Sequence, residues 1–362
     1  MPAKPPLSGH VAVVAGATRG AGRGIARALG EAGAIVYCTG RSVPGNPSPY
    51  NRPETIDETA AMVTAAGGTG IAVRVDHTVE AEVDALFTRV ARDHGRLDVL
   101  VNSIAGEDPL LGAWAAFWQT DFTRGADALR QSILSHLITA KHGAPYMRKR
   151  RRGLIVEVTE GDMVFGGGGN ALTDVVKSSL KGFAARMAGE LWSHRVTAVS
   201  LTPGFLRSEG MLQHFGVTEA NWRDGGKKDP NFLESESPLF VGRAVAALAA
   251  DPKVLDRSGD ILSSWELARD YGFTDYDGRR PDWFTHFGKI LPVIGFLEPF
   301  RRHRAFLGRM TRRMDQYLEA ADAAAPPVEP STKKTSVKKR RLKKRSPTAA
   351  PATARGKTSR RK

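Results

Sequence analysis

The chain has 362 residues, and most of its formal net charge of +15 comes from residues 331–362, which contain 14 Lys and Arg but no Asp or Glu. The rest is close to neutral and has the composition of a soluble globular protein with a sizeable core. A single cysteine, Cys38, excludes a disulfide framework and a cysteine metal cluster. The sequence shows neither a signal peptide nor a run of roughly 18 apolar residues, so we expect a cytoplasmic protein.

The segment that organises the chain is residues 11–26, VAVVAGATRGAGRGIA. A short apolar run ends at Gly16, Gly20 and Gly22 and then continues without a proline into an alanine-rich helical pattern. Such glycines allow a sharp turn off a strand, close approach of backbone to a pyrophosphate, and tight helix-on-sheet contact. The first helical turn then offers unpaired N–H groups to an anion. The segment therefore predicts a dinucleotide-binding strand, turn and helix; an ordinary turn in an alanine-rich protein is the alternative.

Apolar runs and helical patterns alternate along the first three quarters of the chain. The alternation predicts an α/β fold with a doubly wound parallel sheet and helices between most of its strands. The predicted strands lie near Val11, Ala34, Ile71, Leu97, Leu154, Val196 and Ile261. We expect an NAD(P)-binding domain over residues 1–278, a helical extension over 279–325 and a disordered basic tail over 326–362.

The glycine spacing, with three residues and then one residue between glycines, resembles that of the short-chain dehydrogenase/reductase family. Matching segments follow in the same order over residues 9–273. The resemblance implies a Rossmann fold, a nicotinamide cofactor, and hydride transfer between an alcohol and a carbonyl. It also implies a homo-oligomer formed through the helices around Ser132 and Thr173. The small-molecule substrate is not implied, because specificity depends on the shape of the lid.

Two arginines predict the cofactor preference. Arg41 stands about twenty residues past the glycine turn, where an Asp or Glu would bind the adenine ribose of NAD. Arg19, inside the turn, adds a second guanidinium group. Two such groups suit a 2′-phosphate, so we expect NADP(H) to be preferred over NAD(H). The alternative is that both arginines are simply solvated.

The resemblance supplies the other cofactor positions. Asp76 is expected to contact the adenine, Asn102 and Ala105 lie beside it, and Ser208 stands where the family has a Thr that contacts the nicotinamide amide. The expected cofactor-binding residues are Gly16, Thr18, Arg19, Gly20, Gly22, Arg41, Asp76, Asn102, Ala105, Lys177, Pro203, Gly204 and Ser208.

The catalytic positions depart from the family pattern. By resemblance, a Tyr donates the proton, a Lys four residues later lowers the pKa of that Tyr, a Ser polarises the carbonyl and an Asn holds a relay water. Lys177 matches the Lys, but Thr173 stands at the Tyr position, Glu160 at the Ser position and Ser132 at the Asn position. A threonine hydroxyl is too weak an acid and too short to replace a phenol. Loss of a positioned acid typically costs about a hundredfold to ten-thousandfold in rate.

Glu160 also changes the charge expected near the nicotinamide. An ionised carboxylate there favours the oxidised ring and opposes the negative charge that develops on a reduced carbonyl. Two alternatives follow: an ion pair with Lys177 makes the site structural, or burial raises the pKa of Glu160 until it serves as the acid. His77 and His136 match no family role, and a lone His is more often a surface or core residue.

Two functions are consistent with this pattern. The first is an NADP(H)-dependent oxidoreductase that acts on an unidentified alcohol or carbonyl. The second is a family member that has lost the acid and binds NADP(H) as a scaffold or sensor. Nothing in the sequence predicts a metal site.

Residues 205–238 are the segment in which the family builds a lid over the substrate, and we call them the lid. Its large apolar residues either line a substrate pocket or pack the lid onto the body of the domain. These residues are Phe205, Met211, Phe215, Trp222 and Phe232.

Residues 283–318 form an extension in which an apolar run precedes a basic helical pattern. Packing on the body or on a second subunit is one interpretation, and an interfacial helix on an anionic membrane is another. The tail, residues 331–362, has almost nothing to bury, so we expect it to be disordered. Its charge predicts non-specific attraction to nucleic acid or to an anionic membrane surface, unless it only keeps the chain soluble.

Overall fold

The computed structural model describes residues 4–47, 51–105, 117–161 and 171–290, together with positions 312, 315–317 and 319. Residues 1–306 form one compact unit and residues 307–362 form a second. The described positions of the second unit are helical. The tail that we expect to be disordered lies outside the described residues, as does most of the extension.

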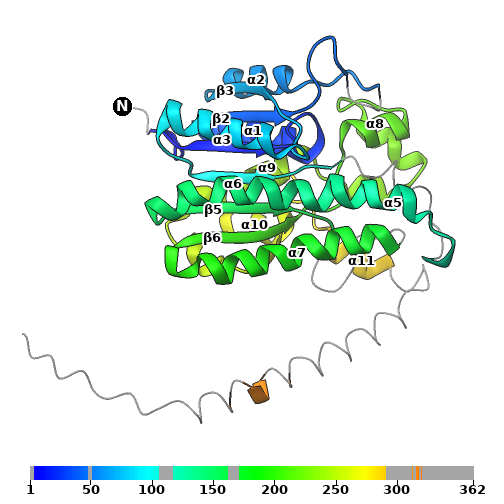
Figure 1. Ribbon diagram of the computed structural model, residues 1–362. Helices are drawn as coiled ribbons and strands as arrows, with labels where there is room; N and C mark the ends of the chain where they lie inside the picture. The colour runs from blue at the N-terminus through cyan, green and yellow to red at the C-terminus, as the bar shows by residue number, and fades with distance from the viewer. Residues whose placement is uncertain are drawn as a thin grey trace, which may run out of the picture. The chain divides into compact units, whose positions relative to one another are not determined.

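A seven-stranded sheet forms the centre of the first unit, and every strand pair in it is parallel (Figure 1). Its order is β3-β2-β1-β4-β5-β6-β7. The strands are β1 Val11–Ala15, β2 Ile35–Gly40, β3 Thr69–Arg74, β4 Val99–Asn102, β5 Gly153–Val158, β6 Val196–Thr202 and β7 Ile261–Ser263. The predicted doubly wound parallel sheet is therefore confirmed, and β4 begins two residues after the predicted position.

The strands are apolar on both faces because both faces are covered. All five residues of β1 are buried, and alternate residues belong to two different core clusters. Ala12 and Val14 pack in one cluster, whereas Val11 and Val13 pack in the other. This alternation follows from the two-residue repeat of a strand, and it explains why continuous apolar runs predicted these strands.

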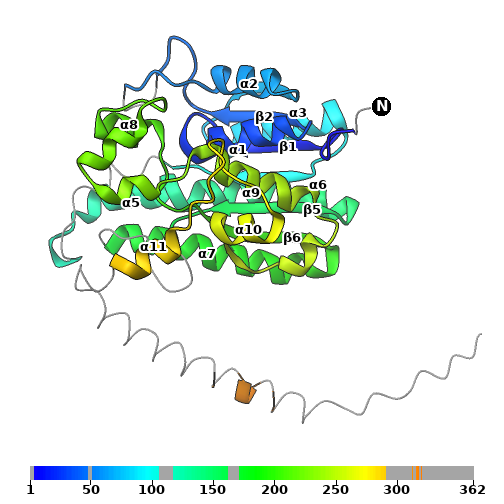
Figure 2. The ribbon, with the colours of Figure 1, turned by 180° about the vertical axis from the view of Figure 1, so that it is seen from behind.

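Helices form the two outer layers, which Figures 1 and 2 show from opposite sides. Helices α1, α2, α9 and α10 contribute to one core cluster, and α3, α6 and α7 contribute to the other. Their bounds are α1 Gly20–Glu31, α2 Ile56–Ala65, α3 Glu80–His94, α5 Phe122–Leu129, α6 Ser135–Arg150, α7 Ala171–Leu191, α8 Glu209–Phe215, α9 Pro238–Ala250, α10 Ser264–Tyr271 and α11 Trp283–Ile290.

One helical rod runs through α5 and α6 and is interrupted by a π-helical turn at Arg130–Leu134. Ser132 lies in this turn, and its side chain is buried. A π turn adds a residue to the helical repeat and is uncommon except as a single turn, frequently near functional sites. The turn therefore marks the Ser132 position as a point of local irregularity.

Two further observations concern the chain as a whole. Cys38 is fully buried in β2, and burial raises the pKa of its thiol to about 12. In the part of the chain that the structure describes, no helix is both long enough and apolar enough to cross a membrane.

Candidate active site

The carboxyl ends of β1 and β4 meet at the point where the strand order reverses. In open α/β sheets a crevice forms at this point, because the following helices leave on opposite faces. The glycine turn, residues 16–22, follows β1 at this edge, and the loop beginning at Ser103 follows β4. The residues that surround this edge therefore make up the candidate site.

The glycine turn leaves no room for a side chain at Gly16 or Gly22. Gly16 has a φ of +82°, and a Cβ atom there would lie 2.3 Å from the carbonyl oxygen of Ser103. A Cβ atom on Gly22 would lie 2.2 Å from the carbonyl oxygen of Gly16. The buried Thr18 lies within the turn, and its carbonyl oxygen accepts a hydrogen bond of 2.9 Å from Arg23 Nε. This bare backbone in front of the first turn of α1 fits a dinucleotide diphosphate.

A buried glutamate that the sequence analysis did not single out lies beside Arg19. Arg19 NH1 is 3.4 Å from Glu54 Oε2. Arg52 binds both carboxylate oxygens of Glu54, at 3.0 and 2.6 Å. Burial opposes the ionisation of Glu54, but the hydrogen bonds and charges of Arg52 and Arg19 outweigh it and lower the pKa of Glu54. Arg19 is therefore part of a charged cluster and is not simply solvated.

Arg41 follows β2 directly and lies beside Asp76, with 3.7 Å between Arg41 NH1 and Asp76 Oδ2. Asp76 Oδ1 accepts hydrogen bonds from Thr78 N at 2.9 Å and from Thr78 Oγ1 at 2.6 Å. Burial disfavours the Asp76 carboxylate, but the Thr78 hydrogen bonds and Arg41 lower its pKa overall. The structure thus places a carboxylate beside each of the two arginines.

A buried polar network lies behind the end of β4. Strand pairing sets Asn102 beside Glu157, and Asn102 Nδ2 donates to Glu157 Oε1 at 2.7 Å. His136, from α6, contacts Glu157 Oε2 through Nδ1 at 2.6 Å and the carbonyl oxygen of Ile104 through Nε2 at 3.0 Å. None of the three side chains is exposed. The amide nitrogen of Asn102 is therefore engaged within the core, whereas its Oδ1 atom is buried without a hydrogen-bond partner, and His136 is a core residue.

Both ring nitrogens of the buried His136 have hydrogen-bond partners. A backbone carbonyl only accepts hydrogen bonds, so the nitrogen that faces Ile104 is the donor of that contact. The other nitrogen lies 2.6 Å from a carboxylate oxygen of Glu157. A signal for this pair existed in the sequence: a Glu inside the apolar run of β5 needs a buried partner.

His77 is also a buried core residue. Its ring nitrogens lie 2.8 Å from Thr39 Oγ1 and 2.8 Å from Thr139 Oγ1. Burial, with a further contribution from nearby His136, lowers the pKa of His77 to about 3. His77 is therefore neutral near physiological pH.

The four positions predicted for catalysis lie on elements that border the site. Lys177 is buried in α7, and Thr173 is half-buried one turn before it. Thr159 Oγ1 donates to the carbonyl oxygen of Lys177 at 3.1 Å, which ties the end of β5 to α7. Helix α7 also contacts the π turn that holds Ser132. The structure therefore brings the end of β5, helix α7 and the π turn together. Residues 162–170, between β5 and α7, lie outside the described residues.

The side chain of Glu160 is exposed. The burial needed to make Glu160 an acid is therefore not present at this position. The backbone here is close to Lys181, whose Nζ lies 3.5 Å from the carbonyl oxygen of Glu160 and 3.4 Å from that of Gly161.

A third buried glutamate, Glu236, supports the segment after β6. Glu236 Oε2 accepts a hydrogen bond from Gly204 N at 2.9 Å and another from Ser264 Oγ at 2.6 Å. Burial is the largest influence on Glu236 and raises its pKa from 4.5 to about 8. Its Oε1 atom is buried without a hydrogen-bond partner. Glu236 is therefore largely protonated near pH 7 and holds the segment expected to face the nicotinamide.

Ser208 and Ala105 are two further residues of the predicted cofactor site. Ser208 is the N-cap of α8, and its hydroxyl accepts from Met211 N at 3.4 Å. Ala105 is exposed and is the last described residue before the gap at residues 106–116. Pro203 is half-buried after β6.

The aromatic residues of the lid pack on one another. Phe215, Trp222 and Phe232 form a separate buried cluster, and Phe205 and Met211 pack against it. The rings of Phe215 and Phe232 stack with their centroids 4.1 Å apart. The structure therefore shows these residues packed within the lid itself, whereas the two interpretations of the sequence are a substrate pocket and packing of the lid onto the body. Among the described residues, no group of three or more His, Cys, Asp or Glu is placed to hold a metal ion.

Comparisons with known proteins point to a common family. The short chain dehydrogenase model matches residues 10–216. Dehydrogenase/reductase SDR family member 1 of Mus musculus is 38% identical over 302 residues, covering 81% of this chain and 91% of that protein. A 3-oxoacyl-(acyl-carrier-protein) reductase of Synechocystis is 30% identical over 206 residues, which cover 56% of this chain and 76% of that protein. A solved short chain dehydrogenase from Mycobacterium thermoresistibile has a TM-score of 0.63 and 20% identity, covering 77% of this chain and 92% of that one.

Proposed function

This chain belongs to the short-chain dehydrogenase family of oxidoreductases, and we propose that it transfers hydride between NADP(H) and an alcohol or carbonyl substrate. The glycine turn carries the proposal. Its backbone excludes side chains at Gly16 and Gly22, and it precedes the amide groups of α1 at the switch point of the sheet. That arrangement suits a dinucleotide diphosphate.

The preference for NADP(H) is supported by charge at the adenine end. Arg41 takes the place where an acidic residue would bind the ribose of NAD, and Arg19 in the glycine turn supplies a second guanidinium group. Each arginine has a carboxylate neighbour, but the contacts of 3.4 and 3.7 Å are long. A 2′-phosphate offers these guanidinium groups shorter, charge-assisted hydrogen bonds.

The roles of the catalytic positions follow from their chemistry. The bound nicotinamide supplies or accepts the hydride. Lys177 supplies positive charge near the nicotinamide ribose, as its family counterpart does. Thr173 and Ser132 offer hydroxyl groups that orient a carbonyl or a water but are poor proton donors near neutral pH. We therefore propose slow turnover in which water supplies the proton that the family Tyr otherwise donates.

Turnover of NADPH with a panel of aldehydes and ketones tests this proposal. The wild-type chain is expected to oxidise NADPH slowly, and Lys177→Ala is expected to abolish that activity. A Thr173→Tyr/Glu160→Ser variant restores the family pattern at two positions and is expected to gain about a hundredfold or more. Loss of wild-type turnover in Glu160→Gln would instead identify Glu160 as the acid.

The absent Tyr favours a second candidate function, an NADP(H)-binding scaffold or sensor. In that case the wild-type chain binds cofactor but shows no turnover, and activity arises only in the Thr173→Tyr/Glu160→Ser variant. This result distinguishes a site that has lost its catalytic activity from the active site of a slow enzyme.

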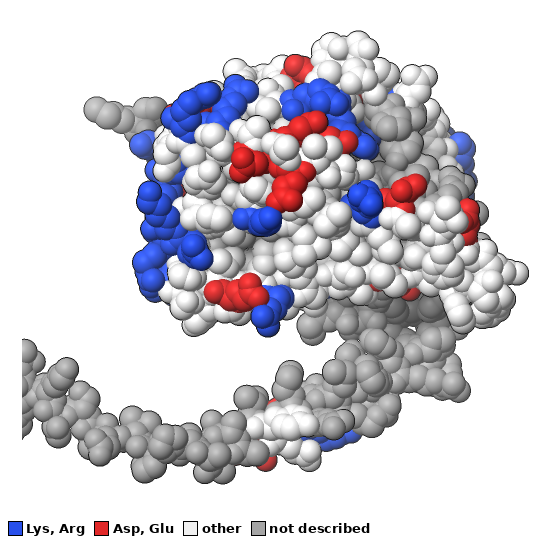
Figure 3. Space-filling model, in the orientation of Figure 1, with Lys and Arg blue, Asp and Glu red and all other residues white. Residues whose placement is uncertain are grey.

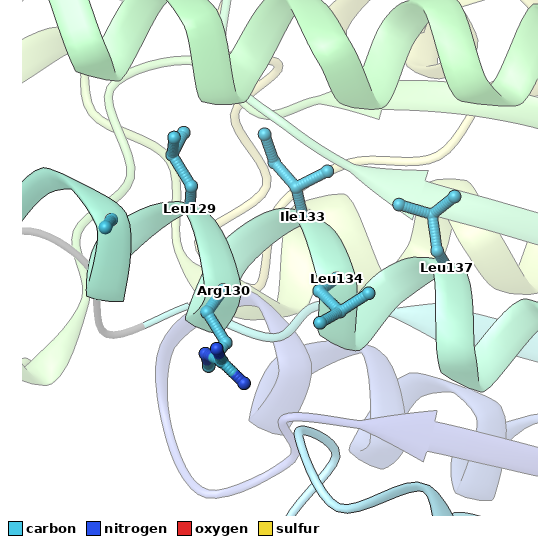
Figure 4. A pocket seen from close by; sticks show the side chains of 6 residues that line it. Leu129, Arg130, Ile133, Leu134 and Leu137 are labelled. Carbon is cyan, nitrogen blue, oxygen red and sulfur yellow. The ribbon is translucent and has the colours of Figure 1, made fainter.

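We propose that the partner of this chain is a second copy of itself. An open groove of about 280 Å³ runs along the α5–α6 rod and is lined by Ala126, Leu129, Arg130, Ile133, Leu134 and Leu137. Figure 4 shows Leu129, Ile133 and Leu137 on one side of the rod, with Arg130 and Leu134 directed to the other. Leu134 and Val175 are 43% and 49% exposed, although both are large and apolar. An oligomer through these helices would cover them.

The basic character of the chain supports a weaker proposal, a polyanion partner. Figure 3 shows Lys and Arg gathered along the edge of the molecule at which α6 ends. Arg148, Lys149, Arg151 and Arg152 are exposed there. These cations would add to any attraction of the tail to nucleic acid or to an anionic membrane surface. The single buried cysteine is consistent with the cytoplasm as the site of action.

A further inference from the structure

The lid is fastened to the glycine turn by a carboxylate. Glu209, the first residue of α8, accepts a hydrogen bond from Gly20 N through Oε2 at 2.7 Å, although the two residues are 189 apart in sequence. Gly20 is the first residue of α1, so its N–H group has no partner within the helix. An anion is favoured at this position by the helix dipole. A side chain of the lid therefore occupies an amide of the turn that we propose binds the cofactor diphosphate.

A second contact holds the same helix one turn further along. Gln213 Oε1 accepts a hydrogen bond from Arg52 NH1 at 2.6 Å, and Arg52 is itself held by Glu54. Residues four apart on a helix lie on the same face. One face of α8 is thus held at two points, by Gly20 in the glycine turn and by Arg52.

Two arginines lie near Glu209, and each of them also binds another carboxylate. Arg23 Nε lies 3.7 Å from Glu209 Oε1, which is too long for a hydrogen bond, and Arg23 also binds Glu58 Oε2 at 3.0 Å. Arg52 interacts electrostatically with Glu209 but binds both carboxylate oxygens of Glu54. A diphosphate at the first turn of α1 would therefore approach a carboxylate whose neighbouring cations are shared with other acids.

We propose that Glu209 is a positioning residue that links the lid to the cofactor: its carboxylate and the cofactor diphosphate share the amide groups at the N-terminus of α1, and each weakens the binding of the other. This inference rests on the proposed function. The linkage is reciprocal, so a bound diphosphate loosens the fastening of α8 by the same factor by which Glu209 weakens cofactor binding. The lid is then held most tightly to the glycine turn when the diphosphate is not bound. Cofactor binding releases the lid so that it can accommodate the substrate.

Glu209→Gln separates the charge from the contact. The glutamine side chain has the same length, and its carbonyl oxygen can still accept a hydrogen bond from Gly20 N. Glu234→Gln is the matched control, because Glu234 is a half-buried acid at the end of the 3-10 turn Pro230–Glu234 in the same lid. Both substitutions remove one negative charge from the lid, but only the first removes it from the N-terminus of α1.

The test is titration of the full-length wild-type, Glu209→Gln and Glu234→Gln proteins with NADPH, followed by nicotinamide fluorescence. Glu209→Gln is expected to bind NADPH about threefold to tenfold more tightly than the wild type, with Glu234→Gln within about twofold of it. A purely structural role would weaken binding in Glu209→Gln. Binding that is equal in all three proteins, or weaker in Glu209→Gln, overturns the inference and leaves the proposed function intact. If none of the three binds NADPH or NADH at millimolar concentration, the proposed function fails and the inference fails with it.

Discussion

His136 Nδ1 lies 2.6 Å from Glu157 Oε2, and neither side chain is exposed to solvent. The pair joins α6 to β5 directly behind the loop that follows β4, because the other nitrogen of His136 binds the carbonyl oxygen of Ile104. Removing one member of such a pair leaves the other buried without a partner, which is strongly destabilising.

Glu157→Ala removes the carboxylate that His136 and Asn102 contact, so it is expected to lower the free energy of unfolding by about 3–5 kcal/mol. Glu190→Ala is the control, because Glu190 forms an exposed pair with Arg186 on α7 and should cost about 0.5 kcal/mol or less. Urea denaturation of the two variants and the wild type measures both values. Equal midpoints for Glu157→Ala and Glu190→Ala would show that the buried pair contributes little.

Glu236 predicts a pH dependence of stability. Its pKa is about 8 in the folded protein and 4.5 in a solvated chain, so the folded state holds a proton that the unfolded state releases. The stabilisation is complete below pH 4.5 and is lost as the pH rises toward 8, by at most about 1.4 kcal/mol per pH unit. Glu236→Gln mimics the protonated acid, so its stability should change less between pH 5.5 and 7.5. If the urea midpoint falls by the same amount between pH 5.5 and pH 7.5 in the wild type and in Glu236→Gln, this prediction is wrong.

Two glycines should respond in opposite ways to alanine. In Gly22→Ala the new Cβ would lie 2.2 Å from the carbonyl oxygen of Gly16, so the glycine turn must distort and both stability and cofactor binding should fall. Gly182 lies inside α7 with nothing within 4 Å of its Cβ position, so Gly182→Ala should stabilise the chain by about 0.5–1 kcal/mol. Thermal unfolding of the two variants gives the sign of each effect.

The proposed oligomer depends on the exposed apolar residues of the α5–α6 rod. Leu134→Glu/Leu137→Glu places one charge on each of two sides of the rod, where Leu134 and Leu137 are 43% and 38% exposed. We expect this variant to be monomeric in light scattering after size-exclusion chromatography, and the wild type to be a dimer or tetramer. Leu233→Glu is the control, because Leu233 is 40% exposed in the lid, away from this rod. A wild-type monomer, or a double variant of unchanged mass, would argue against this interface.

The fold and the glycine turn were predictable because their signals are local. The apolar run, Gly16, Gly20 and Gly22 lie within a few residues of one another, and each apolar run needs only burial on both faces to become a strand. The packing of the lid was not decided by sequence, because the same aromatic residues suit a pocket or a core. Their mutual contacts depend on a chain path that composition does not specify.

The buried charges of the site could not be predicted in the same way. His136 and Glu157 are 21 residues apart, and their contact depends on how α6 packs on the sheet. Glu54 reaches Arg19 across 35 residues, and Glu209 reaches Gly20 across 189. Sequence spacing identifies partners within one helix or one turn, whereas these contacts depend on tertiary structure.

The most direct test of the proposed function is the affinity of the full-length wild-type chain for NADPH and for NADH, measured by isothermal titration calorimetry at one ionic strength. The account predicts that NADPH binds at least about tenfold more tightly than NADH, and that Arg41→Gln removes most of this difference. Equal affinity for the two cofactors would contradict the assignment of Arg41 and Arg19 to the 2′-phosphate. No binding of either cofactor at millimolar concentration would contradict the central claim that the glycine turn binds a nicotinamide dinucleotide.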